Sequence, residues 1–342
     1  MDIGATPDEN NANDYLFASW QLSALDNRLK VNAAINRTNI KMVQHSATPK
    51  ITKDSKNSPM IGAMYDVTKE ISVFAVHSTS LFPTTDKNDF DKQMPAVTGD
   101  SYEGGLKVEL MGGKISGTIS YYEITQKGGS QRDPSATNRN QTIWDSLTPT
   151  ERGVRFPNNS TRESLNDRGG SPGDLVAGGT AESKGFEADL IFQPTPEWQV
   201  MVSYAHNDQE VTKAVNAATI GQSTSGHIKD QFALLTKYTF TQGPVDGLSI
   251  GMGMQAAGKA LQDYSAPGAT ARYNPSTFYA EVFAGYKFKA FGYDHKIQLN
   301  LKNLTTQDNY VGWYAKSGSG YAVDRYKVPS KMIWNLSYDL QF

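Results

Sequence analysis

Residues 332–342 read MIWNLSYDLQF, and this stretch decides the fold. Every second residue in it is apolar or aromatic: Met332, Trp334, Leu336, Tyr338, Leu340 and Phe342. The intervening residues are polar except for the first. Alternation with a period of two is typical of a β-strand with one apolar and one polar face. Because the polar face carries Asn335, Ser337 and Asp339, the pattern predicts a strand of a membrane-spanning barrel, with water on one side and lipid on the other.

The same alternation recurs along the chain. It is clearest in six further stretches, namely residues 29–36, 186–192, 198–205, 248–255, 278–288 and 297–302. The polar faces of these stretches include the charged residues Glu187, Asp189, Glu281 and Lys287. A soluble β-sandwich rarely buries such charges, and a row of aromatic residues facing water would favour aggregation. A barrel with a polar interior is therefore favoured over a soluble β-rich surface or carbohydrate-binding protein.

The connections between these stretches alternate between short and long. The short ones lie near residues 26–27, 66–69, 112–113, 194–197, 243–247 and 290–294. The long ones cover roughly residues 44–57, 81–100, 128–180, 212–229, 262–276 and 308–325. Outer-membrane barrels have this asymmetry, with short periplasmic turns and long extracellular loops. We therefore predict an all-β, antiparallel transmembrane β-barrel segment of about 13 strands, each with the ~9–11 residues that a tilted membrane strand needs.

The composition excludes several classes of protein. The chain has no Cys, and its five His are scattered, so it has no disulfide and no set of side chains spaced to bind a metal. Its net charge of -2 argues against nucleic acid as a partner. The sequence has no apolar run of the ~18 residues that a membrane-spanning helix needs, and no nucleophile or phosphate-binding motif. We expect no cofactor, no catalytic residue and hence no enzyme.

Four segments carry a resemblance to a known family. They are TGDSYEGGLK at residues 98–107, SKGFE at 183–187, PTPEW at 194–198 and LNLKNL at 299–304. In this order and spacing they resemble the hairpin and penultimate-strand motifs of TonB-dependent siderophore receptors, and the resemblance covers most of residues 14–342. It departs from the family after Leu304, where the family usually continues N-L-F-D-x-x-Y and this chain has TTQDNY, so the contacts of that loop cannot be transferred.

The resemblance implies a 22-stranded barrel whose lumen is filled by a plug domain. If residues 326–342 form the last strand, then residues 14–24 form the first strand of this chain, and residues 1–13 are the tail of an extracellular loop. The sequence contains no recognisable plug, TonB-binding segment or signal peptide. We therefore expect residues 1–342 to be a partial barrel that is inactive alone.

The resemblance also implies a function and partners. The function is import of a ferric siderophore across the bacterial outer membrane, driven by TonB through the missing plug. The barrel-assembly machinery would read the terminal residues Tyr338, Leu340 and Phe342, and the wall would contact outer-membrane lipid and lipopolysaccharide. Two alternatives stay open: a passive outer-membrane pore, and TonB-dependent uptake of cobalamin, haem or a carbohydrate.

Candidate substrate contacts lie in the expected long loops. Residues 128–180 contain six Arg, and Thr148 to Glu151 has the pattern that caps the start of a helix. Arg forms charge-assisted hydrogen bonds to the oxygens of a ferric siderophore, and Trp or Tyr supplies apolar area. The candidates are Trp144, Arg152, Arg155, Tyr264, Tyr273, Tyr310, Trp313, Tyr314 and Tyr321. Alternatively, the aromatic residues pack the loops together or lie at the membrane interface, and the arginines contact lipopolysaccharide phosphates.

Overall fold

A computed structural model gives the fold of most of the chain. It describes residues 8–45, 50–84, 86–133, 135–157, 159, 161–162, 165, 174–224, 226–263, 272–305, 311–317, 320–327 and 331–341. Strands make up 69% of the chain and helices 8%. Within these described ranges, no helix is both long and apolar enough to cross a membrane. The prediction of an all-β fold is confirmed.

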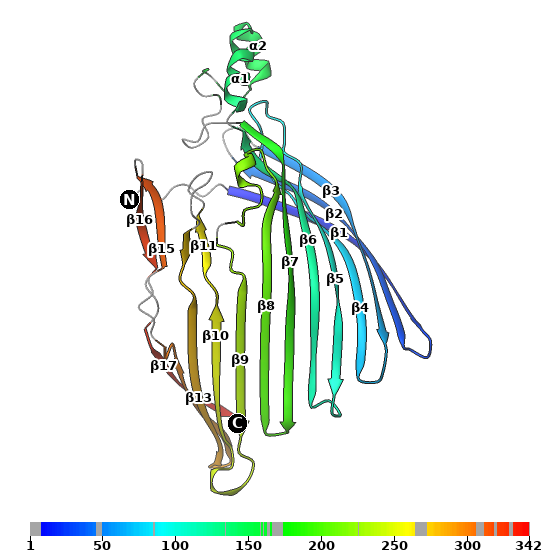
Figure 1. The fold of residues 1–342 in the computed structure, drawn as a ribbon, viewed down its shortest axis with the longest axis vertical. Coiled ribbons are helices and arrows are strands. Elements are labelled where there is room, and N and C mark those ends of the chain that lie inside the picture. Colours follow the sequence, from blue (N-terminus) through cyan, green and yellow to red (C-terminus); the bar gives the residue numbers. More distant parts are fainter. Residues whose placement is uncertain are drawn as a thin grey trace.

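One antiparallel sheet of 13 strands dominates the structure (Figure 1). Its strands are β1 (Asp8–Ala24), β2 (Leu29–His45), β3 (Lys50–Asp66), β4 (Ile71–Phe82), β5 (Val97–Leu110), β6 (Ile115–Asp133), β7 (Asp174–Thr195), β8 (Trp198–Lys213), β9 (Asp230–Thr239), β10 (Leu248–Ala257), β13 (Thr277–Ala290), β14 (Tyr293–Lys302) and β17 (Ile333–Gln341). Each strand pairs with the next one in this order, so the sheet is a simple meander. Within the described residues, β1 pairs only with β2 and β17 only with β14, which leaves the sheet open at both edges. The expected count of about 13 strands is confirmed.

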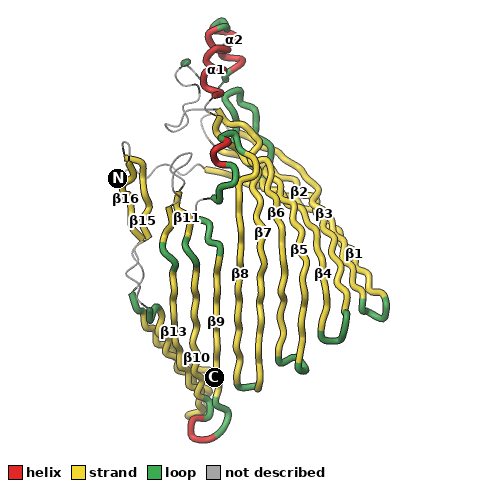
Figure 2. The backbone as a smooth tube through the Cα atoms, viewed as in Figure 1, coloured by secondary structure: helices red, strands yellow, loops and turns green. Residues whose placement is uncertain are grey.

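The remaining elements lie in the connections. Two small hairpins are formed by β11 (Ala260–Asp263) with β12 (Arg272–Asn274), and by β15 (Val311–Ser317) with β16 (Gly320–Lys327). Between β6 and β7 lie the helices α1 (Ser135–Asp145) and α2 (Pro149–Arg155). Short 3-10 helices follow β8 at Ala217–Thr219 and β9 at Gly243–Val245. Figure 2 shows that α1 and α2 stand beyond one end of the sheet, at the end opposite the tight turns.

The pairing register puts the apolar residues of all 13 strands on one face. Leu336 of β17 lies opposite Leu299 of β14, which lies opposite Ala284 of β13. Ala284 in turn lies opposite Ile250 of β10, which lies opposite Tyr238 of β9. We call this face the apolar belt. One of its members from each strand, in spatial order, is Trp20, Val31, Ala63, Ala75, Leu106, Ile119, Ala188, Val202, Leu234, Met252, Val282, Leu299 and Leu336.

The opposite face is polar, as a water-filled interior requires. Glu187 and Asp189 of β7 lie opposite Ala205 and Ser203 of β8. The Ser203 hydroxyl donates a hydrogen bond of 2.6 Å to the Asp189 carboxylate. These charged side chains therefore sit on the face away from the apolar belt, where the alternation predicts them.

The chain reverses tightly at one end of the sheet (Figure 1). In the turn between β1 and β2, residues Leu25, Asp26 and Asn27 have φ angles of 54°, 54° and 64°. Among residues with side chains, Asp and Asn adopt this left-handed conformation most readily, so the local sequence suits the turn. The other connections at this end are also short, as predicted.

Two boundaries differ from the prediction. β1 begins at Asp8, so residues 8–13, which we expected in a loop tail, belong to a strand. β2 extends to His45 and β3 begins at Lys50, so most of the expected loop at residues 44–57 is strand. Apart from Ile51, residues 44–45 and 50–57 are polar in sequence and therefore give no period-two signal, whereas the backbone hydrogen bonds that pair the strands do not depend on side chains.

The expected loops near the C-terminus also contain strands. Residues 262–276 hold part of the β11–β12 hairpin, and residues 308–325 hold most of the β15–β16 hairpin. The last strand, expected over residues 326–342, begins only at Ile333. β11 and β12 have only four and three residues, too few for alternation to identify them, and the sequences of β15 and β16 do not alternate regularly between apolar and polar residues.

Candidate functional site

The long connection between β6 and β7 folds into two helices at the loop end of the sheet. α2 begins with a capping box, as the sequence predicts: the Thr148 N–H donates to the Glu151 carboxylate at 2.8 Å, and the Glu151 N–H donates to the Thr148 hydroxyl at 3.4 Å. The Thr148 hydroxyl also donates to the Glu151 carboxylate at 2.7 Å, and this hydrogen bond, together with the one from the Thr148 N–H, lowers the pKa of Glu151 below its usual value. The cap fixes where α2 starts and hence which of its side chains face α1.

An apolar cluster holds the two helices together. It contains Trp144, Phe156 and Leu165, which are 7%, 0% and 3% exposed. Phe90, from the connection between β4 and β5, packs against Phe156 with ring centroids 5.0 Å apart. Two long loops are therefore joined by one core. We call α1, α2 and the 83–96 connection that packs on them the loop module.

Two candidate arginines take part in this packing. The Arg152 guanidinium donates a hydrogen bond of 3.0 Å to the Trp144 carbonyl and lies 5.3 Å from the centroid of the Trp144 ring. The Arg155 guanidinium lies 4.9 Å from the centroid of the Phe90 ring. The structure thus brings Trp144, Arg152 and Arg155 together, but the Arg152 contacts join α1 to α2 and the Arg155 contact joins α2 to the connection between β4 and β5. A role for them in substrate binding stays a prediction.

A buried cluster of polar side chains, the polar cluster, also holds the loop module in place, and the sequence analysis missed it. Asn140, Asp89 and Asp174 are 0%, 2% and 1% exposed. The Asn140 amide donates to the carboxylates of Asp89 and Asp174, at 3.0 and 3.2 Å, and the Asp89 N–H donates to Asp174 at 2.7 Å. Buried carboxylates are tolerated when they are hydrogen-bonded in this way. No local sequence pattern could indicate the polar cluster, because its members lie far apart in the sequence.

A polar pocket of about 700 Å³ lies between the ends of β7 and β8 and the β11–β12 hairpin. Tyr273, one of the predicted substrate residues, is half exposed and lines it. Lys229 forms an ion pair with Asp208, which raises the pKa of the Lys229 ammonium, and Lys184 lies 3.1 Å from Glu182. Because Lys184 and Asp208 are paired and continue the outward row of residues above the apolar belt, this part of the pocket wall lies on the outer face.

The other predicted contacts are only partly described. Trp313 and Tyr314 lie in β15 and Tyr321 in β16, with Trp313 paired to Arg325 and Tyr321 to Lys316. Tyr264 and Tyr310 lie outside the described residues. The structure therefore places three more candidates in one hairpin, and their contact with a substrate stays a prediction.

The terminal strand carries the residues predicted for barrel assembly. Tyr338 and Leu340 lie on the apolar belt, opposite Ile297 and His295 of β14. The Tyr338 hydroxyl is hydrogen-bonded to His295 Nδ1 at 2.6 Å. Phe342 lies outside the described residues. The edge strand β17 is thus paired with β14 up to Gln341.

The described residues contain no group of three or more His, Cys, Asp or Glu side chains arranged to hold a metal ion. The loop end of the sheet carries Arg, Lys and Tyr hydrogen-bond donors together with carboxylates. The sheet below it has one apolar and one polar face. Such groups suit non-covalent binding of a bulky polar ligand.

Comparison with known proteins identifies the architecture. The family described as "TonB dependent receptor-like, beta-barrel" matches residues 3–304. The chain belongs to this family. Barrels of this family reside in the bacterial outer membrane, so the apolar belt is the lipid-facing surface of an outer-membrane protein.

Several curated relatives are siderophore or metal receptors. The chain is 24% identical over 216 residues to the ferripyoverdine receptor of Pseudomonas aeruginosa, a match that covers 63% of this chain and 22% of the receptor. It is 25% identical over 237 residues to a metal-pseudopaline receptor from the same organism, which covers 69% of this chain and 27% of that receptor. The chain thus matches about a quarter of the length of these relatives.

Solved structures share the fold. The pyoverdine receptor of Pseudomonas aeruginosa superposes with a TM-score of 0.69 and 19% identity, over 99% of this chain and 43% of that one. The ferric preacinetobactin receptor of Acinetobacter baumannii gives a TM-score of 0.70 and 18% identity, over 98% of this chain and 43% of that one. Nearly the whole sheet therefore has a counterpart in barrels that bind iron–siderophore complexes.

Proposed function

We propose that this chain forms part of the wall and extracellular loops of a TonB-dependent transporter that imports a ferric siderophore. The observation that carries the proposal is the family match over residues 3–304, whose curated relatives include ferripyoverdine receptors. The open 13-stranded sheet fits part of the 22-stranded barrel expected of such transporters.

In the proposed transporter, the loop end of the sheet receives the substrate. The loop module and the β15–β16 hairpin carry Arg, Trp and Tyr candidates on the side where extracellular loops gather. TonB would supply energy by acting on a plug domain inside the barrel, whereas the described residues supply the wall. The barrel-assembly machinery would recognise the terminal strand, and lipopolysaccharide would contact the outer face.

The proposal is tested by uptake in the bacterium that carries the gene. Cells lacking the gene are grown under iron limitation and given a panel of ⁵⁵Fe-loaded peptidic siderophores of the pyoverdine type. We expect uptake of at least one complex to fall at least tenfold, to return when the gene is restored, and to stop when a protonophore removes the energy for TonB.

Two results would contradict this function. Unchanged uptake of every iron complex would exclude a transporter for this class of substrate. Uptake that persists with the protonophore, together with faster passive entry of small solutes when the gene is present, would instead support the passive pore.

A further inference from the structure

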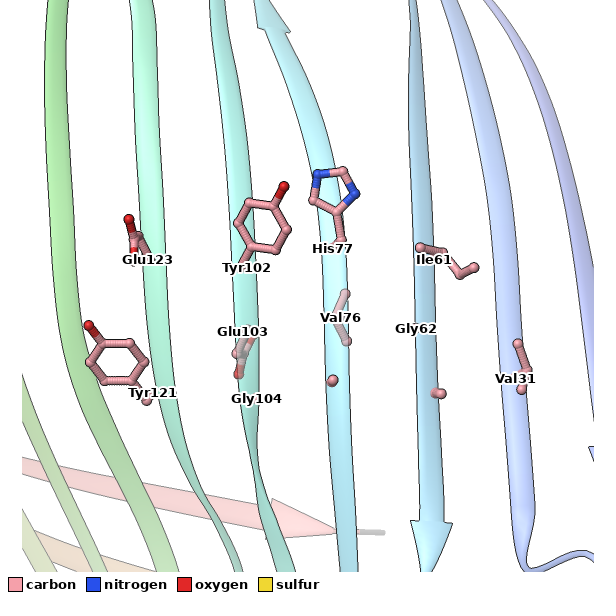
Figure 3. Close-up of a pocket in the computed structure, with 12 residues that line it drawn as sticks. Val31, Ile61, Gly62, Val76, His77, Tyr102, Glu103, Gly104, Tyr121 and Glu123 are labelled. Carbon is pink, nitrogen blue, oxygen red and sulfur yellow. The ribbon is translucent and has the colours of Figure 1, made fainter.

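The outer face of the sheet carries a groove among β2 to β6 (Figure 3). Its volume is about 510 Å³. Its floor is made of the small residues Ala63, Ala75 and Gly104, which lie opposite one another on neighbouring strands. Its sides include Ile61 and Tyr121. We call this feature the outer-face groove.

The groove arises from the sizes of side chains in one row. Ala75 of β4 pairs with Ala63 on one side and with Gly104 on the other, and Gly104 pairs with Tyr121 of β6. Tyr121 pairs in turn with Phe186 of β7, so the row steps from a glycine to two aromatic rings. Three small side chains beside large ones leave a depression in the surface.

The groove has a polar end. His77, Tyr102 and Glu123 each lie two residues nearer the loop end than Ala75, Gly104 and Tyr121. Figure 3 shows Tyr102 above Gly104 and Glu123 above Tyr121. The His77 ring stacks on the Tyr102 ring at 4.5 Å, and its Nε2 is hydrogen-bonded to the Asp100 carboxylate at 2.8 Å.

Glu123 completes the polar end and lies 3.4 Å from the Lys184 ammonium. The rim therefore has carboxylates, an imidazole and one ammonium, whereas the rest of the groove is apolar. This polarity gives the groove a direction, from the loop end into the apolar belt.

We propose that the outer-face groove holds one acyl chain of an outer-leaflet glycolipid, with the hydroxyl and amide groups of the lipid at the Asp100 and Glu123 end. The inference concerns the membrane-facing wall and does not depend on which substrate is transported.

The position of the groove argues for an acyl chain. Its floor belongs to the apolar belt, which faces lipid in an outer-membrane protein, and Tyr102 and Tyr121 at its edge are 58% and 54% exposed on the sheet alone. A concave apolar surface buries more of a flexible chain than a flat one and holds it in one place. Since the polar end points to the extracellular loops, the chain enters from the outer leaflet.

The chemistry of the rim argues for a glycolipid head. Asp100 and Glu123 are hydrogen-bond acceptors, which match the hydroxyl and amide donors of an acylated sugar. The rim therefore favours a head group that presents hydroxyl or amide donors to these carboxylates, and the lipid found on the protein separates a glycolipid from a phospholipid.

The test fills the groove without disturbing the fold. Ala75→Leu places three more carbon atoms on the floor and keeps the residue apolar. The matched control is Ala284→Leu, the same change on the belt of β13, outside the groove. Folding of each variant is checked by the mobility of the unboiled barrel on gels. The full-length protein is extracted from outer membranes in mild detergent, and bound lipid is identified and counted by native mass spectrometry.

We expect the wild-type protein and Ala284→Leu to retain one glycolipid. We expect the fraction of protein that carries this lipid to be at least tenfold lower for Ala75→Leu. A second variant, Asp100→Ala with Glu123→Ala, leaves the floor intact and is expected to weaken retention of the same lipid severalfold. Equal retention by wild type and Ala75→Leu would overturn the proposal. So would a wild-type protein that carries no lipid, or one that carries a phospholipid in place of the glycolipid.

Discussion

At the scale of single residues, the start of α2 depends on the Thr148 hydroxyl. Replacing a Thr cap with Ala costs about 1 kcal/mol of helix stability. We expect Thr148→Ala to lower the hydrogen-exchange protection of residues 149–155 about fivefold while leaving the sheet unchanged, as read by mass spectrometry. Thr150→Ala, on the exposed surface of the same helix, is the control. Equal loss of protection in both variants would mean that the cap does not hold this helix.

The same capping box makes the end of the loop module sensitive to pH. The hydrogen bonds from Thr148 lower the folded-state pKa of Glu151. The stability from the ionised carboxylate is therefore fully present above the unfolded pKa of Glu, about 4.3, and is lost as the pH falls through the lower folded value. We expect protection factors in α2, corrected for intrinsic exchange, to fall in acid. Glu151→Gln should remove this dependence, and a persistent dependence in that variant would assign it to another group.

A substitution at Asn140 tests how much the polar cluster stabilises the loop module. Asn140→Ala removes the hydrogen bonds that its amide donates to Asp89 and Asp174, and loss of a partner by a buried polar group costs about 1–3 kcal/mol. We expect faster proteolysis within residues 135–157, with the strands intact. Asn138→Ala, an exposed change on the same helix, should cleave at the wild-type rate. Cleavage of Asn140→Ala at the wild-type rate would show that the apolar cluster alone holds the loop module.

At the scale of elements, the apolar belt predicts which face of each strand tolerates charge. Met252 lies on the belt of β10, and Gln255 lies on the polar face of the same strand. An Arg facing lipid near the bilayer midplane costs about 2–4 kcal/mol. We expect Met252→Arg to lower the free energy of unfolding of the full-length barrel in lipid by that much, as measured by urea titration, and Gln255→Arg to change it little. A larger shift for Gln255→Arg would mean that the two faces are assigned the wrong way round.

Period-two alternation was enough to predict the strands but not their ends. The membrane-crossing segments were found because lipid on one side and water on the other impose opposite polarity on neighbouring residues. That constraint ends above the belt. Residues 44–45 and 50–57 are polar except for Ile51, and they continue β2 and β3 through the backbone pairing of the two strands. Strand length beyond the membrane is therefore not encoded in the pattern that identifies the strand.

The candidate site was predictable only in its composition. Trp144, Arg152 and Arg155 lie in the connection between β6 and β7, and the capping box of α2 forms. Their partners could not be read from the sequence, because Phe90, which contacts Arg155 and Phe156, comes from another loop. An Arg or aromatic residue whose chemistry suits substrate binding can instead pack against another loop. Only the structure shows which of these two roles its contacts fit.

At the scale of the whole molecule, the two open edges of the sheet lead to the last prediction. Within the described residues, β1 and β17 each have a neighbouring strand on one side only, so the backbone N–H and C=O groups on the other side have no strand to pair with. Such edges are costly in lipid, where no water satisfies them, and they pair with other chains. Residues 1–342 expressed alone are therefore expected to associate in detergent, as measured by light scattering during size-exclusion chromatography, and to restore no ⁵⁵Fe-siderophore uptake in cells that lack the gene. Full-length protein purified from outer membranes should be monomeric under the same conditions. A monomeric 1–342 with heat-modifiable gel mobility would contradict this, because it would mean that the edges find each other and close a smaller barrel.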